Sequence, residues 1–268
     1  MDVSIIDYYA NHGDSFLHKA KPFWKIVFTT LVIASIILTN ELYLLLGIYV
    51  ALLSLAFWTR LSVVKIVTIA LYPALFALIF AFAMWNGSWI RASVIMLKAL
   101  SAALCMVLLI VTTPYPDVFN VIRPIMPRII AEGLFVTYRS VFILLELTDD
   151  LIKGLKVRGG LTRRRYFSNI KNFSSGIGLL LVRGFDLSEK FYGVMNIRGY
   201  GGKISSSNNN LTFTKNDLIT MVIGLMIFAA VIMTLINTNL LKLSVYVLLL
   251  SVCALIISTI YQQIRIRG

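Results

Sequence analysis

The sequence has few charged residues and almost none of the side chains that build disulfide or metal-bound frameworks. Only 14% of its 268 residues are charged, and it contains two cysteines and two histidines. Cys105 and Cys253 both lie in apolar runs, and His12 and His18 belong to no cluster with metal-ligand spacing. This composition excludes a disulfide scaffold and predicts no metal site.

The sequence also lacks the motifs from which common catalytic sites are built. It contains no GxxxxGK[ST], HExxH or GxSxG pattern, so phosphate-loop, zinc-protease and serine-hydrolase chemistry has no starting residue. The neighbouring carboxylates Asp149 and Asp150 would point about 100° apart on a helix, so they do not converge on one substrate. We expect them to form a solvated face, paired with Lys153. The chain is therefore not expected to be an enzyme or to need a cofactor.

Apolar residues are abundant. They make up 59% of the chain, and the mean hydropathy is +0.85, whereas soluble domains average about 45–50% apolar. The polar first 21 residues lack the apolar centre of a cleavable signal, so the first apolar run is expected to be retained. Because a lipid environment requires internally paired backbone groups, these runs predict an all-α integral membrane protein.

Six apolar runs are long enough, or nearly so, to be transmembrane helices. The first two are shorter than the roughly 20 residues of a usual span and are expected to form a tight hairpin. The six runs cover residues 26–38, 42–58, 63–84, 90–113, 218–236 and 243–261. The predicted organisation is an interfacial arm (1–25), four spans (26–113), a cytoplasmic helical coupling domain (114–215), and two spans with a basic tail (216–268).

The basic residues predict the orientation of the chain. Of 25 lysines and arginines, 15 lie between Arg123 and Lys215. With both termini in the cytoplasm, 22 of the 25 lie on the cytoplasmic side, and only Arg91 and Lys242 lie outside. This positive-inside distribution accounts for the net charge of +13 without a nucleic-acid partner. We therefore expect a multi-pass protein of the cell membrane.

Lys65 and Arg91 lie at the ends of their apolar runs, whereas Lys98 lies deeper within a span. A charged residue inside a membrane is a functional candidate by default. Lys98 lies only about two helical turns from the interface residue Trp89, so we expect its amine to reach the outer surface. The sequence does not assign it a role.

The polar insert carries the pair Arg-Gly twice, as Arg158-Gly159 and as Arg198-Gly199. Two amphipathic helices are expected, over about 129–157 and 174–197, with a basic turn at 162–165 between them and a polar linker at 205–210. Arginine near a helix C-terminus complements the dipole, and the following glycine supplies a left-handed stop. The repeat of this ending after 40 residues indicates more, because a guanidinium on a rigid helix end can anchor a partner protein.

The insert resembles the transmembrane component of energy-coupling-factor ABC importers, the CbiQ/EcfT family, and most closely its cobalt-type members. The resemblance rests on GLFVTYRSVFILLELTDDLIKGLKVRGG and GLLLVRGFDLSEKFYGVMNIRGYGG. The family's two short x-Arg-x motifs match Val157-Arg158-Gly159 and Ile197-Arg198-Gly199, with Val157 and Ile197 in place of the family's usual alanine. The stretch 17–25 is similar to the family's pre-membrane pattern, with altered spacing.

The resemblance implies a non-catalytic coupling subunit. Two cytoplasmic ABC ATPase subunits would each bind one arginine-tipped helix end, and a separate membrane subunit would bind the substrate. Cobalt is the expected substrate, with nickel or a vitamin as alternatives; cobalamin biosynthesis is the associated context. From the residues alone, a self-contained transporter or channel and an intramembrane enzyme stay open as rivals, although each would need polar clusters within the spans.

Overall fold

The computed structural model describes residues 15–58, 63–83, 89–160, 166–201, 214–236 and 241–267, which are almost entirely helical and contain no strand. The chain divides into two compact units, one formed by Met1–Val121 with Asn210–Gly268 and the other by Ile122–Asn209. The sequence-based prediction of an all-α membrane protein is thereby confirmed. The predicted turn at 85–89, the basic turn at 162–165 and the linker at 205–210 lie largely or wholly outside the described residues.

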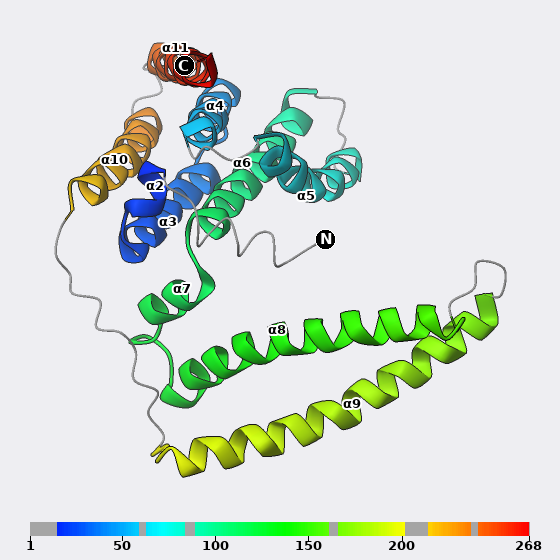
Figure 1. Cartoon of the computed structure of the whole chain (residues 1–268). Coiled ribbons are helices and arrows are strands. Elements are labelled where there is room, and N and C mark those ends of the chain that lie inside the picture. The colour runs from blue at the N-terminus through cyan, green and yellow to red at the C-terminus, as the bar shows by residue number, and fades with distance from the viewer. Residues whose placement is uncertain are drawn as a thin grey trace. The chain divides into compact units, whose positions relative to one another are not determined.

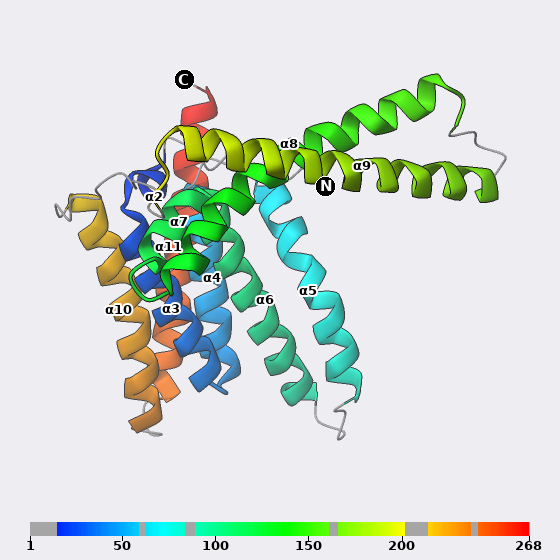
Figure 2. The ribbon, with the colours of Figure 1, turned by 90° about the horizontal axis from the view of Figure 1, so that it is seen from below.

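The first unit is a bundle of apolar helices (Figures 1 and 2). Its elements in chain order are α2 (Phe16–Lys19), α3 (Pro22–Leu38), α4 (Leu42–Trp58), α5 (Val63–Ala83), α6 (Trp89–Thr112), α7 (Tyr115–Ile122), α10 (Lys215–Ile236) and α11 (Leu241–Arg267). Three of the six expected spans, in α5, α6 and α10, are long and apolar enough to cross a membrane. Helices α3 and α4 and the segment Val245–Thr259 of α11 are apolar but shorter.

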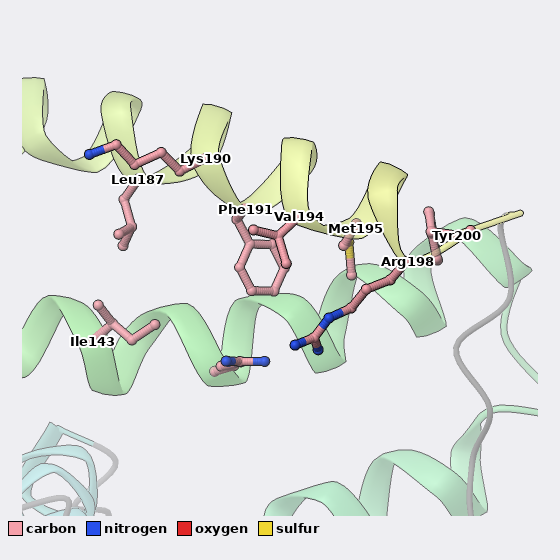
Figure 3. A pocket seen from close by; sticks show the side chains of 10 residues that line it. Ile143, Leu187, Lys190, Phe191, Val194, Met195, Arg198 and Tyr200 are labelled. Carbon is pink, nitrogen blue, oxygen red and sulfur yellow. The ribbon is translucent and has the colours of Figure 1, made fainter.

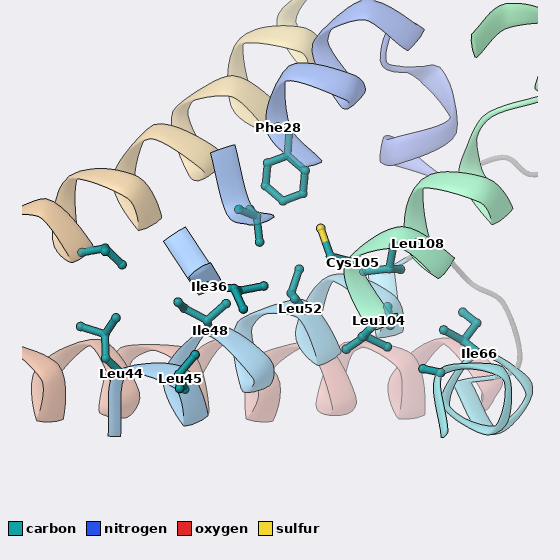
Figure 4. Close-up of a cluster of buried hydrophobic side chains, with 14 residues drawn as sticks. Phe28, Ile36, Leu44, Leu45, Ile48, Leu52, Ile66, Leu104, Cys105 and Leu108 are labelled. Carbon is teal, nitrogen blue, oxygen red and sulfur yellow. The ribbon is translucent and has the colours of Figure 1, made fainter. Parts of the chain in front are cut away.

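Helix α4 lies at the centre of this bundle, in contact with α11, α6 and α5. Leu44, Leu45 and Leu52 are fully buried, and they join residues of α3, α5, α6 and α10 in one apolar cluster (Figure 4). Gly47 allows α11 to approach, because a Cβ at this position would lie 3.4 Å from the backbone of Leu248. Small residues at such crossings let apolar helices pack closely where lipid offers no hydrophobic driving force.

Two charged side chains tie helix ends together near residues 21–25. Lys25 is buried, and its Nζ donates to the carbonyl of Thr112 at the end of α6, at 2.8 Å. Asp217, also buried, accepts from the backbone amides of Lys21 (2.7 Å) and Thr214 (2.9 Å). Pro22 suits the first turn of a helix, and α3 begins at this residue, inside the segment 1–25 that was expected to be an interfacial arm. Lys25 therefore belongs to α3 and not to an arm.

Lys98 of α6 has a contact that the sequence did not reveal. Its Nζ donates to the carbonyl of Ile37 at 3.1 Å and to Oδ1 of Asn40 at 2.9 Å. Ile37 lies in the last turn of α3, where carbonyls have no partner within the helix. Lys98 thus joins α6 to the end of α3 and to the turn before α4.

The second unit consists mainly of two long helices, α8 (Arg128–Val157) and α9 (Tyr166–Ile197). Helix α8 matches its expected bounds within one residue, whereas α9 begins eight residues before the predicted start. Phe167, Ile170 and Phe173 recur every three residues and continue the helix backwards. A start at Ser174 is predicted because serine is common at helix beginnings, but serine inside a helix costs only about 0.5 kcal/mol.

Replacing Lys98 with methionine should lower the stability of the first unit by about 1 kcal/mol, because the carbonyl of Ile37 and the amide oxygen of Asn40 each lose a donor. The midpoint of thermal unfolding in detergent measures the effect. Arg91→Met is the matched control, since Arg91 is an exposed cation on the same helix. Equal midpoints for the two variants would show that the Lys98 contacts contribute nothing.

Candidate functional site

Helix α8 ends in a complete Schellman cap around Arg158. The amide of Gly160 donates to the carbonyl of Leu155 (2.8 Å), and the amide of Gly159 donates to that of Lys156 (3.1 Å). Gly159 has a φ of +68°, a left-handed conformation that side chains with a Cβ rarely adopt. Arg158 is therefore the last residue before the chain reverses its course.

Helix α9 ends in the same way around Arg198. The amide of Tyr200 donates to the carbonyl of Met195 (3.0 Å), the amide of Gly199 donates to that of Asn196 (3.0 Å), and Gly199 has a φ of +74°. Both hydrogen bonds and the left-handed glycine occupy the same cap positions as in α8. The predicted glycine stops are thus confirmed, and the two arginines are equivalent within their caps.

Both tips are exposed. Val157 and Ile197, the residues before the arginines, are each 88% exposed, and Arg158 and Arg198 are exposed as well. Helices α8 and α9 run antiparallel (Figure 1), so the tips lie at opposite ends of the pair. At 1.5 Å per residue, the 30 residues of α8 separate them by roughly 45 Å. The protein therefore presents two apolar-flanked guanidinium groups on a long helical frame.

Each tip is also hydrogen-bonded to the beginning of the other helix. The side-chain amide of Asn172 in α9 donates to the carbonyl of Gly160 at 2.9 Å, next to the Arg158 cap. The hydroxyl of Tyr200, next to the Arg198 cap, donates to Glu132 Oε2 of α8 at 2.5 Å. These two contacts, here named the cross-helix latches, fix each tip to the opposite helix. Neither contact is apparent from the sequence, because the paired residues are 12 and 68 positions apart.

The Tyr200 latch involves a charged group. Glu132 is buried, and its other carboxylate oxygen lies 3.8 Å from Arg128 Nε. The hydrogen bond to Glu132 raises the pKa of the Tyr200 hydroxyl above the ordinary tyrosine value, and Arg128 opposes the shift. Tyr200 therefore keeps its proton and stays a donor at neutral pH.

A groove of about 770 Å³ lies between α8 and α9 beside the Arg198 cap. Leu187, Phe191 and Val194 of α9 project toward α8, which contributes Ile143 (Figure 3). Arg139 of α8 also lines the groove. Its guanidinium lies 5.3 Å from the centre of the Phe191 ring, a cation–π contact that allows a charged residue to face a neighbouring helix.

The cations of this groove come from both helices. Arg139, Lys190 and Arg198 all line it and are exposed, and Arg198 reaches from the end of α9 toward α8 (Figure 3). No acidic side chain is among the described residues that line the groove. The local sequence gives no sign of this arrangement, because Arg139 and Lys190 are 51 positions apart and meet only when the helices pair.

The carboxylates near the end of α8 are exposed to solvent. Lys153 lies 3.5 Å from Asp150, and both are exposed, as predicted for a surface pair. In the part of the chain that the structure describes, no group of three His, Cys, Asp or Glu side chains could hold a metal ion. The exposed guanidinium groups and their apolar neighbours are suited to binding a partner.

Replacing Tyr200 with phenylalanine should loosen the end of α9. We expect amide exchange over residues 196–201 to rise about fivefold, as for the loss of one hydrogen bond, with the helix otherwise intact. In the native chain the Tyr200–Glu132 hydrogen bond should weaken as pH rises above about 10. Because the pKa of Tyr200 is raised in the folded state, its contribution to stability is present below the unfolded-state pKa and is lost as pH rises through the folded-state pKa. Tyr192→Phe, a change at an exposed tyrosine of the same helix, should leave both measurements unchanged.

Comparison with known families identifies the family to which the chain belongs. No curated protein sequence matches the chain. A family model described as "Cobalt transport protein", CbiQ, matches residues 13–210, which include helices α2 to α9 and both arginine tips. This match covers well over half of the 268 residues. The chain, an all-α membrane protein with two capped arginine tips, belongs to the CbiQ family of cobalt transport proteins.

Proposed function

We propose that the chain is the membrane coupling subunit of an energy-coupling-factor ABC importer. It would link ATP hydrolysis by two cytoplasmic ATPase subunits to uptake of cobalt ion by a separate substrate-binding membrane subunit. The observation that carries the proposal is the pair of identical, exposed caps that present Arg158 and Arg198 at opposite ends of one helix pair. Each tip would enter a pocket on one ATPase subunit, with both termini of the chain in the cytoplasm.

The chemistry of the tips suits such a contact. Arginine offers five donors in a planar fork that can bind carboxylates or carbonyls in pairs. Val157 and Ile197 add large exposed side chains beside each guanidinium, and arginine and apolar anchors dominate binding energies at interfaces. The larger Val157 and Ile197, in place of the alanine usual in the family, would require a wider pocket on the ATPase.

The frame between the tips suits transmission of a movement. An ATP-driven approach of two ATPase subunits would displace the tips, and coupling needs elements rigid enough to carry that displacement. The cross-helix latches join each tip to the start of the other helix. A force on the Arg198 cap would therefore act on both α8 and α9.

An apolar stripe along α9 suits the substrate-binding membrane subunit. Its residues recur at steps of three or four and are exposed to different degrees, from 92% at Phe167 to 42% at Phe173. They are Phe167, Ile170, Phe173, Ile177, Leu181 and Phe185. A continuous exposed apolar surface of this kind marks an interaction site. This chain would then hold the ATPases by its tips and the substrate subunit along its side.

Reversing the charge at either tip should abolish assembly with the ATPase pair or abolish uptake. We expect Arg158→Glu or Arg198→Glu to weaken ATPase binding by at least about 30-fold, the effect of losing one interface hot spot of about 2 kcal/mol. Binding is measured by co-purification in detergent with the ABC ATPase subunits of the source organism, and uptake by cobalt accumulation in cells.

Arg183→Glu is the matched control, since Arg183 is an exposed arginine of α9 away from both caps. It should bind and transport normally, and all variants should reach the membrane in equal amounts. Normal transport by both single variants and by the double variant would refute the anchoring role. Cobalt flux through the purified chain alone would instead support a self-contained transporter.

A further inference from the structure

The geometry points to a second, anion-binding contact beside the Arg198 tip: the groove formed by Arg139, Lys190 and Arg198 receives an acidic, partly apolar segment of the ATPase subunit that takes this tip. The inference rests on the proposed function and extends it from a single arginine to a composite site. It also distinguishes the two ends of the helix pair, which the repeated sequence pattern alone presents as equivalent.

The described side chains that line the groove are positively charged or neutral. Its three cations are contributed by both helices, and no described lining residue is acidic. Glu132, the carboxylate that accepts from the lining residue Tyr200, is itself engaged by that hydroxyl and lies near Arg128. Like charges gathered in one groove repel each other, so a bound anion would relieve an unfavourable arrangement. The groove is therefore complementary to carboxylate groups.

The groove is also lined by apolar side chains. Ile143, Leu187 and Phe191 line the groove together with the cations, and the ring of Phe191 lies near the guanidinium of Arg139. A volume of about 770 Å³ accommodates several side chains. A groove lined by both apolar side chains and cations matches an amphipathic segment that carries apolar residues between Asp or Glu side chains.

The position of Arg198 identifies the occupant. Its backbone closes the α9 cap, while its side chain lines the groove and extends toward α8 (Figure 3). A protein that binds the tip must therefore lie against the groove as well. An ATPase subunit is the partner that the tip is proposed to bind, so the acidic segment belongs to that subunit.

The opposite end of the pair lacks this arrangement. Asp149 and Asp150 lie about two turns before Arg158 and are exposed, and Lys153 pairs with Asp150. Two exposed carboxylates therefore accompany the cations Lys153, Lys156 and Arg158 at that end, whereas no described residue that lines the groove is acidic. The two tips would thus meet their ATPase subunits through different surfaces.

The test compares two double variants of the full-length chain in detergent. Arg139→Gln with Lys190→Gln removes two groove cations, and Lys171→Gln with Arg183→Gln removes one lysine and one arginine from exposed positions of α9 outside the groove. The probe is a purified pair of ABC ATPase subunits from the source organism. Kd is measured at about 0.1 M and 1 M salt, where the Debye length falls from about 10 to 3 Å.

We expect the groove variant to bind about tenfold more weakly than the native chain at low salt and to lose most of its salt dependence. The control variant should stay within about twofold of the native chain. Circular dichroism of both variants verifies that the helices are retained.

Two outcomes would overturn the inference. If the groove variant binds like the control while Arg158→Glu and Arg198→Glu still prevent binding, the composite site is wrong and the proposed function stands. If the groove variant keeps its ATPase affinity but no longer binds vesicles of anionic phosphatidylglycerol, the groove is a lipid site. Failure of all tip variants to affect binding would instead reject the proposed function itself.

Discussion

A helix end leaves backbone groups without partners, and this constraint shapes both units of the protein. In the bundle, Lys25 and Lys98 donate to carbonyls at the ends of α6 and α3, and Asp217 accepts from amides before α3 and α10. In the long helix pair, Gly159 and Gly199 allow the chain to turn back and pair its last carbonyls. Side-chain charge serves this purpose in the bundle, and backbone conformation serves it at the tips.

That difference has a functional consequence. Because the caps at Gly159 and Gly199 use only backbone groups, the arginine beside each glycine keeps its guanidinium available for other contacts. An arginine that had to pair the last carbonyls itself would be poorly placed to bind another protein. The cross-helix latches then hold each cap against the neighbouring helix. A helix pair with exposed guanidinium groups at its ends suits the proposed role of transmitting force between partner subunits.

Much of the fold could be predicted from the sequence, because apolar length and helical periodicity are local properties. The bounds of α4 and α8 agree with the predicted segments within a residue, and the glycine stops lie where the repeated Arg-Gly pattern placed them. The early start of α9 was missed, since serine is nearly neutral inside a helix and also common at its beginning. The contact between Arg139 and the Phe191 ring could not be predicted, because helical periodicity does not identify which aromatic ring of another helix an exposed cation will meet.

By itself, the sequence determined the membrane character of the chain, its helical segments and the two motifs Val157-Arg158-Gly159 and Ile197-Arg198-Gly199. Hydrophobicity, charge distribution and the conformational freedom of glycine act over a few residues, so they can be recognised along the chain. The latches and the cationic groove join residues 12 to 68 positions apart. Only the tertiary structure decided them, because the antiparallel pairing of two helices determines which distant side chains come within reach of each other.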